Sequence, residues 1–182
     1  MIKNREDLKR YIDADLARYQ GLKFPLLRRW ILKDEQARLK HYVWVLRHTE
    51  FAINTNSIFK LFWLLWHKRL SNILSVYVHP NMCGPGLRLI HNGGGIYLNA
   101  NAIGDNFTAT SGVIIGKKDT NETRPIIGNN VYFTIGSKAI GRIVIGDNCV
   151  IAPNTVVIKD VPANSVVSGV PGMVFKSNQL IR

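Results

Sequence analysis

The sequence predicts a parallel β-helix that follows a small α-helical N-terminal domain. An apolar residue returns every six positions between residues 103 and 161, and a period of six fits neither an amphipathic helix nor an alternating strand. One pentapeptide recurs in near copies at 103–107, 127–131 and 145–149. Ahead of these repeats, apolar residues recur at three- and four-residue steps, which is typical of amphipathic helices.

The six-residue period sets the size of each coil of the β-helix. The copies at 127–131 and 145–149 begin eighteen residues apart, which is three steps and one triangular coil. We expect the lead residue of each step to point into the coil, and the Gly, Asn or Asp after it to form turns with positive φ. All the lead residues except Asn121 are apolar: Ile103, Ala109, Ile115, Asn121, Ile127, Phe133, Ala139, Ile145, Ile151 and Val157.

The helical domain is expected to contain four helices. The first covers residues 4–19 with Asn4 as its N-cap, a second starts at Pro25, and a third covers residues 34–50. Each has an apolar face on which the helices can pack together.

The fourth helix, at residues 58–70, is the most apolar, although it is too short to span a bilayer. Two alternatives stay open for its apolar face. It can be buried, against the first coil or between subunits, or it can dock on a membrane with its basic end on lipid headgroups. Burial is our preferred expectation, since such stripes usually belong to a core.

The domain boundary is placed near Leu74. This divides the chain into a helical domain at 1–74 and a β-helix domain with a closing segment at 75–182, because glycine-rich stretches that forbid helix begin soon afterwards. Residues 117–125 break the apolar rhythm, and we expect them to form a loop that projects from one corner.

The chain carries a net charge of +12, and the excess lies mainly before the β-helix. Residues 1–75 contain fifteen Lys and Arg against seven Asp and Glu, whereas residues 76–182 contain nine against five. Such a surface attracts phosphates, anionic lipids or nucleic acid, but it is also the composition of a solvated helical face. We expect peripheral membrane contact through the basic helices. No nucleic-acid partner is expected, because no aromatic and basic stacking surface recurs in the repeats.

Cysteine content and the start of the chain suggest a cytoplasmic protein. Cys83 and Cys149 are too few for a disulfide framework, and Cys149 occupies a repeat position where a small apolar residue packs. Residues 1–10 are charged and no apolar run follows them, so no signal peptide is expected. We therefore expect the protein in the cytoplasm, at or near the inner face of the membrane.

The repeats and the segments that follow them resemble one known family. The stretch from Ala152 to Pro162, with Ser-Gly-Val-Pro-Gly at 168–172, is similar to the hexapeptide-repeat acyltransferases. Within that family it most resembles the serine acetyltransferase-like branch, which includes polysaccharide O-acetyltransferases. The resemblance implies a left-handed β-helix, a homotrimer, and acetyl-CoA as co-substrate with no tightly bound cofactor.

The same resemblance points to residues that act on the acceptor. His91, which precedes a glycine-rich turn, matches the family's catalytic base, and His79, followed by Pro80, matches a substrate-side histidine; Asn92 is added to the substrate-binding residues. Two positions depart from the family: an aspartate is replaced by Tyr77, and a histidine by Arg124. In the family, these two residues help to bind the amino acid or its acid chain. Their replacement here therefore argues against L-serine as the acceptor.

Candidate residues for acetyl-CoA also follow from the resemblance. The pantetheine arm can lie along the stacked coils beside small residues, and Lys side chains can bind the phosphates as compact cations. The small residues are Gly136, Ser137, Ala152 and Pro153, and the lysines are Lys117, Lys118 and Lys159.

The expected function is therefore acetyl transfer from acetyl-CoA to a sugar hydroxyl of a capsular or lipopolysaccharide glycan or its precursor. A serine O-acetyltransferase and a non-enzymatic β-helix scaffold remain as alternatives. A γ-class carbonic anhydrase is excluded because it needs three histidine ligands for zinc, and the repeat half of the chain holds only His79 and His91. No metal site is expected.

Overall fold

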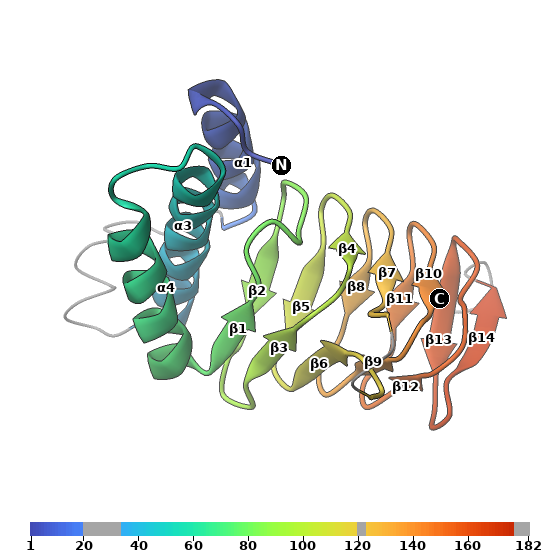
Figure 1. The fold of residues 1–182 in the computed structure, drawn as a ribbon. Coiled ribbons are helices and arrows are strands. Elements are labelled where there is room, and N and C mark those ends of the chain that lie inside the picture. Colours follow the sequence, from blue (N-terminus) through green and yellow to red (C-terminus); the bar gives the residue numbers. More distant parts are fainter. Residues whose placement is uncertain (20–33, 120–122, 177–182) are drawn as a thin grey trace.

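The computed structural model describes residues 1–19, 34–119 and 123–176. Within these ranges, three α-helices gather at one end of a triangular prism made of short strands (Figure 1). They are α1 (Arg5–Ala17), α3 (Glu35–Asn54) and α4 (Lys60–Leu74). The helix expected at Pro25, and the lead residue Asn121, lie outside the described residues.

The prism has three walls, each a stack of strands from successive coils. Every strand pair is parallel except β13 with β14 at the far end. Wall A contains β1 (Val76–Val78), β3 (Ile96–Leu98), β6 (Val113–Gly116), β9 (Lys138–Ile140) and β12 (Val156–Val157). Wall B contains β4 (Ala102–Ile103), β7 (Ile126–Ile127) and β10 (Val144–Ile145). Wall C contains β2 (Arg88–Ile90), β5 (Thr108–Thr110), β8 (Tyr132–Phe133), β11 (Val150–Ile151), β13 (Ser165–Ser168) and β14 (Met173–Lys176).

The hexapeptide lead residues fill the inside of the prism, as predicted. All nine that the structure describes, from Ile103 to Val157, are at most 3% exposed. Cys149 is also buried there as a free thiol, which agrees with its predicted packing position. The loop predicted at 117–125 separates β6 from β7, and its residues 120–122 lie outside the described part.

The turn chemistry differs from the expectation in one respect. Positive φ at the corner between walls B and C belongs to asparagines such as Asn106, at 57°, and not to the glycine two residues before it. Gly104 is required instead by close approach, since a Cβ there would lie 2.7 Å from the backbone carbon of Gly128 in the next coil. The asparagine side chains form a ladder along this corner, from Asn106 through Asn130 and Asn148 to Asn164, with amide contacts of 2.9 to 3.1 Å.

The helices begin close to their predicted caps. Asn4 accepts a hydrogen bond from the backbone of Asp7 at 2.8 Å, and Asp34 caps α3 in the same way. The third helix extends four residues beyond the predicted end, to Asn54. The apolar core of α3 is continuous with that of the first coil, so the helices and the β-helix share one core.

The expected burial of the fourth helix against the first coil is wrong for most of its apolar face. His67, Ser71 and Leu74 face inward, but Leu61 and Leu65 are 67% and 60% exposed. The helix is apolar around most of its circumference, and the first coil can cover only one side of it. Within the described ranges, no helix has the length and apolarity needed to cross a bilayer.

A buried arginine joins the helices to the first coil. The Arg47 guanidinium on α3 contacts Asp15 of α1 at 2.7 Å and Glu50 at 2.9 Å, and donates to the carbonyl oxygens of Cys83 and Gly84 at 3.0 and 2.7 Å. Burial alone would lower the pKa of Arg47, but the two carboxylates outweigh it and raise that pKa, so the arginine stays charged.

Replacing this arginine is expected to destabilise the fold strongly. Arg47→Met leaves two buried carboxylates without their counter-charge and two carbonyl oxygens without the guanidinium donor, so the free energy of unfolding should fall by about 3–5 kcal/mol. The measurement is urea unfolding followed by circular dichroism. Lys9→Met is the matched control, because the Lys9–Asp13 ion pair is exposed and its loss should leave the midpoint unchanged. Equal midpoints for the two variants would contradict the role given to Arg47.

Candidate active site

His91 lies at the corner between β2 and β3, where walls C and A meet. Its backbone has a φ of +54°, a conformation that residues with a Cβ rarely adopt. The following turn closes when the N–H of Gly95 donates to the carbonyl of Asn92 at 2.9 Å. This conformation projects the His91 side chain outward, where it is 67% exposed.

A carboxylate from the helical domain contacts this histidine. The Glu35 Oε2 atom lies 3.0 Å from His91 Nδ1, and Glu35 Oε1 accepts the backbone N–H of Asn92 at 2.6 Å. Partial burial would raise the pKa of Glu35, but these two hydrogen bonds outweigh it and lower that pKa, so Glu35 is ionised near neutral pH. Because a carboxylate only accepts, Nδ1 carries the hydrogen, and in the neutral ring Nε2 is then the acceptor on the other side.

Some of the hydrogen-bonding groups of Asn92 are already bonded within the protein. Its side-chain amide donates to the carbonyl of Leu74, the last residue of α4, at 2.5 Å. The predicted substrate contact can therefore use its side-chain oxygen and its second amide hydrogen. The amide instead fastens the turn to the end of the helical domain.

The small residues predicted for acetyl-CoA stack along the same edge as His91. We call this line of corners, at 91–95, 111–112, 134–137 and 152–155, the His91 edge. The corners bond to one another, since the N–H of Gly112 donates to the carbonyl of Gly95 at 2.6 Å and that of Gly136 to Ser111 at 2.8 Å. The structure thus brings Gly136, Ser137, Ala152 and Pro153 into one row with His91.

Two side chains on this edge differ from the expectation. Ser137 is fully buried, its hydroxyl donates to the carbonyl of Thr134 at 2.6 Å, and its backbone N–H and C=O are bonded to Thr134 and Ile114, so it does not contact a ligand directly. Lys138, which the sequence did not single out, has its Nζ 2.8 Å from the carbonyl oxygen of Gly136. It therefore places a cation beside the row of small residues.

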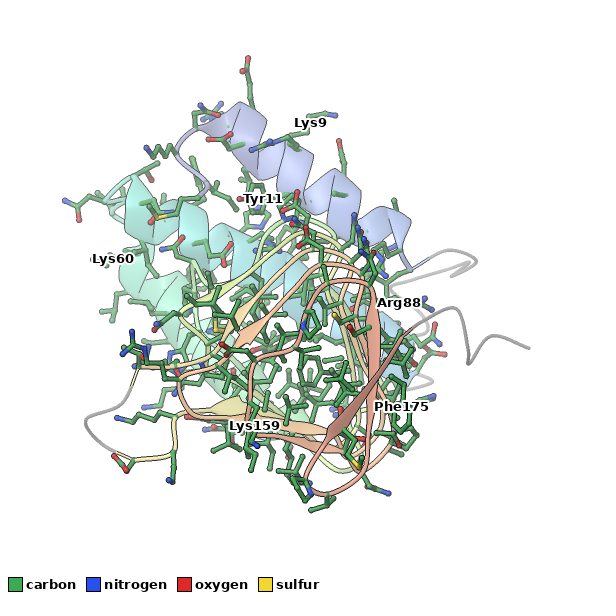
Figure 2. The ribbon with its side chains drawn as sticks, turned by 90° about the vertical axis from the view of Figure 1, so that its right-hand side faces the viewer. Lys9, Tyr11, Lys60, Arg88, Lys159 and Phe175 are labelled. Carbon is green, nitrogen blue, oxygen red and sulfur yellow. The ribbon has the colours of Figure 1, made fainter. Side chains whose placement is uncertain are left out.

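His79, Arg124 and the three predicted lysines lie on the opposite edge of wall A, where walls A and B meet. We call this line of corners, at 79–81, 117–119, 123–125 and 158–160, the lysine edge. His79, Arg124 and the lysines at 117, 118 and 159 are all exposed there. In Figure 2, which views the prism end-on, Lys159 lies on a different side from Arg88 and Phe175 of wall C. One chain therefore does not bring these residues to His91.

Tyr77 lies on the outer face of wall A, between the two edges. Its ring is 6.2 Å from that of Tyr97 in the next coil, and both rings are about 40% exposed. With His79 and residues of α4 such as Leu65, they line a mainly apolar pocket of about 370 Å³. The pocket is a second place, apart from His91, where an acceptor can be held.

Glu35 was missed by sequence reasoning, which assigned it only to the start of a helix. It stands 56 residues before His91. The pattern around residue 35 is that of an ordinary capped helix, so nothing in it signals a partner in the β-helix.

Comparison with known proteins supports the interpretation of the fold. Serine acetyltransferases of Staphylococcus aureus and Staphylococcus xylosus are each 36% identical over 106 residues, which is 57% of this chain and about half of each relative. The solved serine acetyltransferase of Brucella abortus superposes with a TM-score of 0.69 at 26% identity, over 93% of this chain and 67% of that one. The predicted resemblance is confirmed.

Two further similar structures were solved with a ligand bound. The Brucella abortus enzyme in complex with coenzyme A has a TM-score of 0.71 at 23% identity, covering 94% of this chain and 69% of that one. The Neisseria gonorrhoeae enzyme in complex with serine has a TM-score of 0.69 at 24% identity, covering 94% and 70%. No protein-family model matches the chain.

These likenesses define what is established. The left-handed parallel β-helix with a preceding α-helical region is confirmed as the fold class, and the chain resembles the serine acetyltransferase-like branch of the hexapeptide-repeat acyltransferases. The chain spans about half the length of the curated relatives that it matches. Its reaction and substrates are therefore taken up as proposals.

Proposed function

We propose that the protein is an acetyl-CoA-dependent O-acetyltransferase with His91 as its general base. The observation that carries the proposal is the contact of His91 Nδ1 with Glu35, which leaves Nε2 as the proton acceptor on an edge lined by small residues. A histidine in this state can take a proton from a hydroxyl near neutral pH.

The reaction needs few groups from the protein. His91 Nε2 removes the acceptor's hydroxyl proton while the oxygen forms a bond to the thioester carbonyl carbon. The tetrahedral intermediate then breaks its C–S bond, and the proton held by His91 passes to the departing thiolate of CoA. The products are the acetyl ester and CoA, so atoms and charge balance.

The proposed donor is supported by the comparisons and by the edge itself. A similar structure contains coenzyme A, and the His91 edge offers small, partly exposed residues, Gly136 and Ala152, along which a pantetheine arm can lie. Lys117, Lys118 and Lys159 are exposed cations suited to its phosphates.

The acceptor has two candidates. The relatives are named serine acetyltransferases, and one solved neighbour binds serine, which favours L-serine over the sugar hydroxyl expected from the sequence. The sugar is retained as the second candidate because of the pocket beside His79, where Tyr77 and Tyr97 present aromatic faces and no carboxylate lines the wall to receive a serine amine.

Release of CoA from acetyl-CoA, followed with a thiol reagent, is expected with one of the two acceptors. Purified protein is assayed with L-serine and, separately, with capsular or lipopolysaccharide oligosaccharide. His91→Asn should lower turnover by about 10² to 10⁴, because the amide keeps the size but cannot take the proton. Binding of acetyl-CoA should stay unchanged in that variant.

His79→Asn is the matched control for this experiment. It removes an exposed histidine from the lysine edge, so we expect a raised KM for the acceptor and a smaller effect on turnover. Near wild-type turnover by His91→Asn would exclude it as the base. A lack of both CoA binding and CoA release, with either acceptor, would favour the scaffold alternative.

A homotrimer is proposed because a single chain separates the site residues. The His91 edge and the lysine edge flank wall A. In a threefold ring with wall A facing the axis, the His91 edge of one copy adjoins the lysine edge of the next. Wall A supports this arrangement with the outward apolar side chain of Ile114, which is 40% exposed and does not line the pocket beside His79.

Charged substitutions on walls A and B should show which of the two walls forms the subunit contact. Ile114→Arg on wall A is expected to give monomers that transfer no acetyl group, because a buried unpaired charge opposes association. The measurement is sedimentation velocity at micromolar concentration. Ile126→Arg on wall B, where the native side chain is 46% exposed, should leave the trimer intact. The reverse pattern would place the subunit contact on wall B.

Membrane contact through α4 is proposed for its uncovered apolar face. Leu61, Phe62 and Leu65 are more than half exposed, and Lys60, Lys68 and Arg69 lie on the same helix. Lys60 lies on the outer side of the helical domain in Figure 2. No acidic residue occurs between Glu50 and Asp105. An apolar helix with basic residues and no acidic ones suits an anionic lipid surface.

Vesicle sedimentation tests this contact. We expect the wild-type protein to bind phosphatidylglycerol vesicles at low salt and to be released by high salt, since exposed charges are screened. Leu61→Glu should abolish binding, whereas Val144→Glu on wall B should not. If the wild-type protein stays in the supernatant at low salt, α4 is covered by another subunit and not by lipid.

A further inference from the structure

We propose that Glu35 is a positioning residue for His91, one that fixes the ring and its turn so that Nε2 is the atom that takes the proton. This role rests on the proposed function, because it is defined relative to His91 as the base. It adds the helical domain to a site otherwise built from β-helix corners.

The geometry of the carboxylate is specific. Each oxygen of Glu35 has its own partner: one lies 3.0 Å from the His91 ring, and the other accepts the next residue's backbone N–H at 2.6 Å. Because the two partners are adjacent in the chain, the carboxylate fixes the orientation of the ring and the path of the backbone together. A neutral imidazole in water populates both tautomers, whereas an acceptor on Nδ1 selects the one with a free Nε2.

Glu35 is itself held in place. It is the first residue of α3, and the preceding residue, Asp34, caps that helix by accepting the N–H of Ala37 at 2.8 Å. Further along the same helix, Arg47 is locked to the corner at Cys83 and Gly84. The helix is therefore anchored to the first coil at two points, about 18 Å apart for twelve residues of helix.

The contacts made by Glu35 also stabilise the backbone turn at His91. His91 has a positive φ without being a glycine, so its conformation is maintained by surrounding contacts. The Asn92 amide bonded to Leu74 supplies one such contact and Glu35 supplies two. The side chains of Glu35 and His91 are 37% and 67% exposed, so the hydrogen bond between them adds little to global stability. We expect the contact to act mainly on the orientation of the His91 ring.

Kinetics of Glu35→Gln provide the first test. The amide keeps the size of the side chain but can present a donor to Nδ1, which favours the wrong tautomer. We expect kcat to fall about ten- to a hundredfold, less than on loss of the base itself, with KM values for both substrates unchanged. Glu35→Asp keeps the carboxylate on a shorter stem and should recover part of the lost kcat.

Glu6→Gln is the matched control. Glu6 is an exposed glutamate in the first turn of α1, so its substitution removes the same charge from the same kind of helix position. It should change neither kcat nor KM. All variants should unfold at the wild-type temperature, which separates positioning from folding.

Nitrogen-15 NMR of the histidine rings provides a readout that needs no turnover. The chain has five histidines, and the His91 signals are assigned as those lost in His91→Asn. We expect the wild-type ring to be protonated on Nδ1 at pH 8, and Glu35→Gln to shift it to a mixture or to the Nε2–H form. The control variant should leave the signals in place.

The two readouts distinguish the failure of this inference from that of the proposed function. If Glu35→Gln changes neither the tautomer nor kcat, or the wild-type ring carries its hydrogen on Nε2, the positioning role is wrong. If the tautomer shifts but His91→Asn retains full turnover, Glu35 positions a histidine that is not the base, and it is the general-base assignment that fails.

Discussion

The burial of one charged group, Arg47, constrains how the two parts of this chain fit together. A guanidinium with no access to water is tolerated only when every donor is matched, and here the partners come from α1, from α3 itself and from the first corner of the prism. Asp15 and Glu50 also accept the backbone N–H groups of Leu87 and Asn81. The helices are therefore seated on the first coil in one orientation, which a purely apolar contact would not specify.

That orientation has a direct effect on the candidate site. Because α3 is held rigidly against the first coil, its N-terminal glutamate arrives at the corner that carries His91, and the end of α4 arrives at Asn92. The β-helix supplies the row of small residues, and the helical domain supplies the carboxylate. The separation of the other candidate residues onto the lysine edge gives the proposed subunit contact a chemical reason in addition to the burial of apolar surface.

Much of the fold was predictable, and the limits of prediction are instructive. The inward lead residues follow from a period that recurs at short range. The role of His91 comes from its match to a family motif and stays a prediction. The exposed face of α4 could not be foreseen, since an apolar pattern shows that a surface avoids water but not what covers it. The division between two edges also escaped prediction, because residues such as Gly136 and Lys159 are assigned by motif while their corner depends on the register of whole coils. Glu35 depends on tertiary placement alone.

The antiparallel strand β14 affects how copies of the protein can associate in a concentrated solution. A stack of parallel coils ends in unpaired backbone groups, and identical stacks can in principle grow end to end into fibres. At the start of the prism, α3 and α4 cover the first coil (Figure 1). At the other end, β14 folds back on β13 with reversed direction, through four paired residues. An incoming coil of the same sequence would need a parallel template on that wall, and it meets a strand running the wrong way. Strand β14 thus opposes end-to-end polymerisation of the β-helix.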